Sequence, residues 1–188
     1  MAGKDFLKAT QNSKPSFSLL RALKEIDFQE KALDIGCGAF SDSIFLVKKG
    51  FTVDAVDKSV NVINYYTPMK GLKFHNIPIE NFKLNLNEYD IVNAQYSLPF
   101  VSPEIFKNLL KTVLKSIKPG GIYVGQFFGV NDEWSLNKKM TFLTSNEVRS
   151  FFEAFEIIKI EETSHIGKTA VGNKKFWHVI EVIAKKNK

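Results

Sequence analysis

The chain has 188 residues, of which 44% are hydrophobic and 24% charged, and its formal net charge is +6. This length suits one domain with a buried core, which we expect over residues 1–188. The single cysteine excludes an intramolecular disulfide and a cysteine-based zinc cluster, so we expect no metal and a reducing compartment. The sequence has no apolar run long enough to span a bilayer and no secretory signal, which predicts a cytoplasmic protein without a membrane partner.

The positive charge alone does not predict a nucleic-acid partner. Of the 26 basic residues, only Arg21 and Arg149 are arginines. Arginine is the side chain suited to bidentate contacts with phosphate and guanine. We therefore interpret the charge as a lysine-rich solvated surface and do not expect nucleic acid as a partner.

The first half of the chain predicts helices that alternate with short strands. In chain order we expect a helix over 16–26, a strand over 31–35, a helix over 41–49, a strand over 51–57, a helix over 59–66 and a strand over 72–75. The first helix carries its apolar residues at helical spacing, at Phe17, Leu20, Leu23 and Ile26.

The second half continues the alternation and then ends on two strands. We expect a strand over 89–95, a helix over 103–117, a strand over 122–128, a helix over 145–155, and strands over 156–162 and 175–184. Ser102 can cap the helix over 103–117, and the Pro-Gly-Gly at 119–121 should end it. Thr144 and Glu147 have the spacing of a capping box for the next helix.

These elements predict the fold class. Strands alternating with helices are typical of an α/β protein with a doubly wound, mainly parallel sheet of seven strands and helices on both faces. The last two strands have no helix between them, so the final strand should run antiparallel. Residues 1–20 could form a lid at the amino terminus, and 129–143 and 163–175 could form loops on the substrate side.

The stretch KALDIGCGAF, residues 31–40, suggests a ligand site at the first strand end. Gly36 and Gly38 let a ligand approach the backbone closely. The stretch lacks the GK[ST] of a phosphate-binding P-loop, and Ser41 replaces the last glycine of the dinucleotide pattern G-x-G-x-x-G. Asp34 would repel a pyrophosphate but suits a ligand that carries an ammonium group.

A second acid narrows the ligand class. Asp57 ends the second strand at close to the roughly twenty-residue spacing from the glycine turn at which an acid accepts hydrogen bonds from a ribose. A ligand with both a ribose and a cation is S-adenosylmethionine.

Four stretches together carry a family resemblance, namely LDIGCGAF, FTVDAVD, YDIVNA and SIKPGG. Over about residues 17–128 the chain resembles class I S-adenosylmethionine-dependent methyltransferases. The later stretches GQFFGVNDEW, MTFLTSNEV and FWHVIEVIAKK resemble the bacterial small-molecule branch close to the tellurite-resistance and thiopurine-type methyltransferases. The resemblance implies a Rossmann-like fold and a methyltransferase that uses S-adenosylmethionine and releases S-adenosylhomocysteine.

The resemblance also implies roles for particular residues. Asp34 and the backbone of Gly36–Ala39 would hold the methionine end of the cofactor, Asp57 the ribose, and Ile79 and Glu80 the adenine. The full set of residues that we predict to bind the cofactor is Asp34, Gly36, Cys37, Gly38, Asp57, Lys58, Ile79, Glu80 and Gln95.

The chain departs from the family pattern at two positions. Phe40 replaces the usual third glycine, and Pro78 stands where an aspartate is common. We interpret Phe40 as a side chain that packs the following helix against the sheet. The alternative is that Phe40 crowds the cofactor pocket and weakens binding.

Aromatic residues near strand ends are the candidates for binding the methyl acceptor, namely Tyr96, Phe100, Phe128, Trp134 and Trp177. Methyl transfer from a sulfonium needs orientation and desolvation more than a base, so the sequence identifies no catalytic residue beyond two weak candidates, Tyr96 and His178. A lone histidine on an apolar strand is more often structural. Lys14 could face the cofactor carboxylate under the amino-terminal lid.

The leading hypothesis is an enzyme that methylates a small molecule. The stretch SLPF, residues 97–100, weakly resembles the signature of methyltransferases that act on planar amino nitrogens, which makes a nucleic-acid or protein nitrogen methyltransferase the alternative. Phe40 and Pro78 motivate a third hypothesis, a degenerate cofactor-binding module without catalysis.

Overall fold

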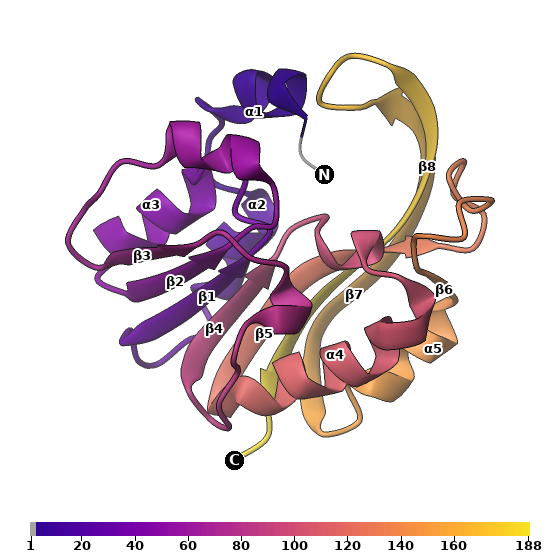
Figure 1. Ribbon diagram of the computed structural model, residues 1–188. Coiled ribbons are helices and arrows are strands. Elements are labelled where there is room, and N and C mark those ends of the chain that lie inside the picture. The colour runs from indigo at the N-terminus through magenta and orange to yellow at the C-terminus, as the bar shows by residue number, and fades with distance from the viewer. Residues whose placement is uncertain (1–2) are drawn as a thin grey trace.

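The predicted strands lie side by side in one sheet in the computed structural model, which describes residues 3–188 (Figure 1). The strands are β1 (Lys31–Ile35), β2 (Thr52–Val56), β3 (Leu72–His75), β4 (Tyr89–Ala94), β5 (Ile117–Gly129), β6 (Phe142–Leu143), β7 (Phe155–Lys168) and β8 (Lys174–Lys186). Their order is β3-β2-β1-β4-β5-β8-β7, and the short β6, which the sequence did not predict, pairs with β5.

The strand directions confirm the predicted fold class. Strands β1 to β6 pair in parallel, whereas β8 runs antiparallel to both of its neighbours, β5 and β7. A parallel pair needs a crossover between its strands, and helices lie in the crossovers from β1 to β5, whereas β5 and β6 are joined without a helix. The carboxyl ends of β1, β2 and β4 therefore meet at one edge of the sheet.

Helices cover both faces of this sheet (Figure 1). They are the α-helices α1 (Lys4–Thr10), α2 (Phe17–Ala22), α3 (Ser41–Lys48), α4 (Pro103–Ser116) and α5 (Ser145–Phe151), and the 3-10 helices η1 (Val60–Tyr65), η2 (Ile79–Asn81) and η3 (Leu98–Phe100). Within residues 3–188, no helix is long and apolar enough to cross a membrane.

Alternating side chains of each buried strand enter two separate cores. In β1, Leu33 points into the core under α4, whereas Ala32 points into the core under α2 and α3. Leu110 of α4 and Leu46 of α3 are fully buried, one in each core. Both sheet faces are thus covered, which explains why the parallel strands read as nearly continuous apolar runs.

Some predicted helices differ from the structure. The helix expected over 59–66 is the 3-10 helix η1, and the helix expected over 16–26 is the single short helix α2. Phe17 is 79% exposed, because α2 turns Ser18, Leu19 and Ala22 to the sheet instead. Ser102 precedes α4 without a side-chain cap, and α4 ends at Ser116, before the Pro-Gly-Gly stretch.

The final two strands form a long hairpin. Their register runs from Phe155↔Lys186 to Lys168↔Lys174. Figure 1 shows this hairpin curving beyond the sheet on the side of α1.

The predicted capping box of α5 is confirmed, since Thr144 and Glu147 each bond the other's main-chain N–H.

Candidate active site

A cavity of about 790 Å³ lies at the carboxyl ends of β1, β2 and β4. It lies at the edge of the sheet where open α/β folds bind ligands. All nine residues predicted to bind the cofactor line it, and so do all five aromatic residues predicted to hold the acceptor. The amino-terminal segment and the β7–β8 hairpin contribute further lining residues, among them Phe6, Lys14, His165 and Lys168.

The glycine turn after β1 depends on two left-handed residues. Gly36 has φ of 74° and Gly38 has φ of 50°, a region that glycine enters without the steric cost of a side chain. A Cβ on Gly36 would also collide with the side chain of Ser97. The main-chain N–H groups of Gly36 and Cys37 donate to the carbonyl of Val56, at 2.7 and 3.2 Å, which ties the turn to β2.

Asp34 lies beneath this turn and is almost fully buried. The Ser43 hydroxyl donates to its Oδ2, and Asn93 Nδ2 donates to its Oδ1 at 2.8 Å. Burial, together with the nearby charge of Asp42, raises the pKa of Asp34 to about 7. A second carboxylate thus shares the site, and a cationic group would relieve the repulsion between the two.

Asp42 connects the site to the amino-terminal segment. The Ser16 N–H donates to Asp42 Oδ1 at 2.8 Å, and the Ser16 hydroxyl also donates to this carboxylate. Asn93 Nδ2 lies 3.0 Å from Asp42 Oδ2, so a single amide contacts the carboxylates of both Asp34 and Asp42. The sequence prediction did not include Asp42, whose one local signal is its place in the first turn of α3.

Asp57 is oriented by two main-chain donors. Its Oδ2 accepts from the Gly38 N–H at 3.1 Å, and its Oδ1 accepts from the Ser59 N–H at 2.8 Å. The carboxylate therefore faces the glycine turn from the end of β2 and lines the cavity. Each carboxylate oxygen has two lone pairs, so both can still accept a hydroxyl hydrogen bond from a ligand.

Buried polar side chains extend inward from the acids. Gln95 Nε2 donates to Asn93 Oδ1 at 2.7 Å, and the Ser18 hydroxyl donates to Gln95 Oε1 at 3.0 Å. Gln126 Nε2 in turn donates to Ser18 Oγ at 3.2 Å, and its Oε1 accepts from the Tyr96 N–H at 3.2 Å. This chain of hydrogen bonds joins α2, β4 and β5 and holds the main chain at Tyr96.

The five cavity aromatics form one cluster of ring contacts centred on Phe128. Trp134 and Trp177 are 5.6 Å apart, and Phe128 lies within 6.2 Å of each of the other four rings, measured between ring centroids.

Tyr96 has φ of 48°, which is uncommon for a residue with a side chain. Burial, with the charge of Glu181, raises the pKa of Tyr96, so this hydroxyl stays protonated at neutral pH.

Comparison with known proteins identifies the family. The sequence model of the family described as tellurite resistance protein TehB matches residues 2–177. The chain belongs to the TehB family. TehB from Haemophilus influenzae has a similar structure, with a TM-score of 0.75 and 18% identity, over 97% of this chain and 66% of that one.

Two further proteins are similar to this TehB family member. An uncharacterized methyltransferase from Synechocystis is 26% identical over 101 residues, which span 50% of this chain and 45% of that protein. The structure of a Burkholderia thailandensis 1,6-didemethyltoxoflavin-N1-methyltransferase has a TM-score of 0.63 and 14% identity, over 98% of this chain and 79% of that one. The family match, together with the methyltransferases among the similar proteins, confirms the predicted resemblance to class I methyltransferases, whose methyl donor is S-adenosylmethionine.

Two predicted residues of this TehB family member lie away from the cavity. Phe40 is 1% exposed, and its ring packs against Tyr66 and Phe74 at centroid distances of 5.5 and 5.0 Å. His178 is also buried, with Nδ1 accepting from the Asn131 N–H at 3.0 Å and Nε2 lying 2.7 Å from Glu162. Neither residue lines the cavity, and the contacts of His178 suit a structural role.

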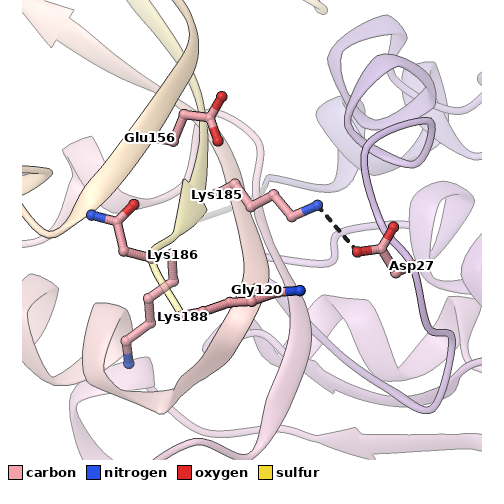
Figure 2. A pocket seen from close by; sticks show the side chains of 7 residues that line it. Asp27, Gly120, Glu156, Lys185, Lys186 and Lys188 are labelled. Carbon is pink, nitrogen blue, oxygen red and sulfur yellow. Dashed lines mark hydrogen bonds and ion pairs between the residues drawn. The ribbon is translucent and has the colours of Figure 1, made fainter.

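A second, smaller pocket lies at the opposite edge of the sheet (Figure 2). It has a volume of about 300 Å³, and its lining includes Gly120 at the start of β5 and Lys185 at the end of β8. Lys185 forms an ion pair with Asp27 at 3.4 Å, and Lys186 Nζ donates to the carbonyl of Ile117 at 2.7 Å. These lysines tie the end of β8 to the segment before β1 and to the start of β5, and none of the predicted site residues lines this pocket.

Proposed function

We propose that this chain transfers a methyl group from S-adenosylmethionine to a small-molecule acceptor by in-line displacement. The observation that carries the proposal is one cavity with two chemically different sides. Carboxylates and a glycine turn line the cofactor side, and contacting aromatic rings line the acceptor side. A ligand with an ammonium group and a ribose fits the first side, and a flat or apolar acceptor fits the second.

The residues of the cofactor side fit the methyl donor. Within residues 3–188, the hydroxyl of Ser97 is a buried polar group without a hydrogen-bond partner, and it lies beside the glycine turn. A buried polar group without a partner is costly, so a ligand group that bonds it would be favoured. Asp34 and Asp42 would hold the ammonium of the methionine end, and the backbone of Gly36–Ala39 would lie along it.

The remaining cofactor contacts follow the turns after β2 and β3. Asp57 would accept hydrogen bonds from the ribose, with Lys58 beside it. Ile79 and Glu80 line the cavity at η2 and would contact the adenine, and Gln95 would close the site from β4. Phe40 packs outside the cavity, which argues against the hypothesis of a degenerate module whose site Phe40 closes.

The acceptor side would act by orientation and exclusion of water. S-adenosylmethionine supplies an electrophilic methyl group on a sulfonium, a good leaving group. The rings would hold the acceptor against this methyl in a dry environment, which strengthens every electrostatic interaction there. Because the pKa of Tyr96 is raised, its hydroxyl can donate a hydrogen bond to the acceptor but does not serve as a base at neutral pH.

The Burkholderia relative supports a small-molecule acceptor, since its structure contains 1,6-didemethyltoxoflavin and S-adenosylhomocysteine. The nitrogen methyltransferase that acts on nucleic acid or protein has less support, because the resemblance of Ser97–Phe100 to its signature is weak. For both hypotheses the methyl donor is the same, so they differ only in the acceptor.

Isothermal titration with S-adenosylhomocysteine tests the proposed cofactor side. We expect micromolar binding by the wild type and weaker binding by Asp57→Ala. A hydrogen bond to a charged acceptor contributes about 1.5–3 kcal/mol, so the expected loss is on the order of 10- to 100-fold. Glu153→Ala, in an exposed residue that does not line the cavity, is the matched control. A folded Asp57→Ala variant with unchanged affinity would contradict the ribose assignment, and a wild type that does not bind would contradict the proposed function.

A further inference from the structure

An ion pair lies buried next to the aromatic residues of the cavity. Lys175, near the start of β8, and Asp132, in the connection between β5 and β6, have side chains that are 1% and 0% exposed. Lys175 Nζ lies 2.5 Å from each carboxylate oxygen of Asp132 and 3.3 Å from the carbonyl of Phe176. All three ammonium hydrogens therefore have an acceptor.

The same ammonium group contacts the acceptor-side rings. Lys175 Nζ lies 3.9 Å from the ring centroid of Trp177, 4.3 Å from that of Trp134 and 5.2 Å from that of Phe128. These three rings line the cavity, whereas Lys175 and Asp132 do not. The charge thus lies behind the rings, where cation–π attraction favours one orientation of each ring.

Asp132 fixes the main chain of the two segments that carry the tryptophans. Its Oδ1 accepts from the Trp134 N–H at 3.0 Å, and its Oδ2 accepts from the His178 N–H at 3.1 Å. Trp134 belongs to the connection after β5, and Trp177 directly precedes His178 on β8. One carboxylate therefore sets both backbones, while its lysine partner sets both rings.

A buried ion pair is a poor device for stability alone. When such a pair is replaced by apolar side chains of similar volume, the protein is often equally stable or more stable, because burying two charges removes their hydration. We propose that Lys175 and Asp132 are a positioning pair that fixes Trp134 and Trp177 as the wall of the acceptor side. The proposal rests on the proposed function for its meaning in methyl transfer, but the position of the rings can be measured without turnover.

Tryptophan fluorescence reports how exposed these two rings are, because Trp134 and Trp177 are the two tryptophans of the chain. The variants are Lys175→Met, Asp132→Asn and the double variant. Each single variant leaves one buried group without its charge partner and should be less stable, whereas the double variant removes the pair and should recover stability. We expect all folded variants, including the double variant, to show red-shifted emission and stronger quenching by acrylamide, because the indoles lose their fixed position.

The control is Lys118→Met, which also separates a lysine from a buried aspartate, Asp90, but at the other edge of the sheet. We expect wild-type emission and quenching from this control. In every folded variant, affinity for S-adenosylhomocysteine should stay within about twofold, as for a distant site. With an acceptor that supports turnover, the double variant should raise KM for the acceptor more than KM for S-adenosylmethionine.

The outcomes separate this inference from the proposed function. A folded double variant with wild-type emission and quenching would overturn the positioning role, since the rings would then keep their place without the pair. Emission changes of the same size in Lys118→Met would overturn it too. If the wild type does not bind S-adenosylhomocysteine, the proposed function fails, and the fluorescence result still decides how the tryptophans are held.

Discussion

The pKa of Asp34 is raised, and we propose that this carboxylate binds a cationic group of the cofactor. The protonation of Asp34 should therefore control the affinity for the cofactor. Burial and Asp42 bring the pKa of Asp34 to about 7, and only the ionised form attracts an ammonium group. Below that pH, affinity for S-adenosylhomocysteine should fall by up to about tenfold per unit, because one proton must leave on binding. At higher pH, loss of the ligand's own α-amino proton removes its positive charge and weakens binding again.

Titration calorimetry from acidic to alkaline pH should therefore give a maximum of affinity between the two pKa values. Asp57→Ala should lower affinity at every pH and move the acidic limb to lower pH, because the charge of Asp57 also helps to raise the pKa of Asp34. A constant affinity through the range in which Asp34 titrates would contradict the contact between Asp34 and the ammonium group.

The buried ring of Phe40 stabilises the protein by packing, whereas the strained backbone of this residue offsets part of that stabilisation. Its φ of 65° is left-handed, which costs a residue with a side chain about 1–2 kcal/mol. Phe40→Ala should lower the free energy of unfolding by about 3–5 kcal/mol, since it removes a buried ring. Phe40→Gly removes the same ring but relieves the strain, so it should be less destabilising than Phe40→Ala by about 1 kcal/mol. Urea unfolding measures both, and the opposite order would contradict the left-handed conformation.

Single residues show how far the sequence predicts the lining of the cavity. The places of Asp34, Gly36 and Asp57 in this lining could be predicted because their chemistry and spacing are local. Asp42 and Ser97 could not, because their surroundings come from distant parts of the chain. Ser16 reaches Asp42 from 26 positions earlier, and Ser97 meets the glycine turn only after β1 and β4 pair.

At the scale of the element, α2 packs on the sheet through Leu19 and Ala22, and the hydroxyl of Ser18 adds hydrogen bonds to this contact. Ser18 donates to Gln95 and accepts from Gln126, and all three are buried or half-buried. Ser18→Ala should lower the free energy of unfolding by about 1–3 kcal/mol, because two polar groups lose their partner. Ser150→Ala, whose exposed hydroxyl bonds only within α5, should change it by no more than about 0.5 kcal/mol. If chemical unfolding gave the same change in the free energy of unfolding for both substitutions, the hydrogen bonds of Ser18 would not anchor α2.

The prediction for this helix was wrong about which face is buried. The spacing of Phe17 and Leu20 predicts a buried apolar face, but Leu19 and Ala22 are buried instead, and Ser18 on the same face bonds residues 77 and 108 positions away. The strands were predicted well because both of their faces are covered, which leaves a continuous apolar run in the sequence. The two strands of the β7–β8 hairpin were predicted because no helix separates them, but residues 163–168, expected in a loop, extend β7 instead.

At the scale of the whole molecule, the charge of +6 permits a test of the nucleic-acid alternative. A lysine-rich surface should bind RNA weakly and lose that binding between about 50 and 200 mM salt, since it rests on counterion release. Fluorescence polarisation with a labelled RNA measures this, and S-adenosylhomocysteine should not change it. Tight binding that persists at the higher salt would instead favour a macromolecular acceptor.

The place of β8 in the sheet determines the order in which the site can be assembled. Among the described strands, β7 pairs with β8 alone, so it joins the sheet only when β8 has been inserted beside β5. During synthesis, a nascent chain that has emerged as far as β5 already carries every residue proposed for the cofactor, from Asp34 to Gln95. It lacks both tryptophans and Lys175. The proposed acceptor wall is thus completed last in the order of synthesis, after every residue proposed to hold the methyl donor has already been made.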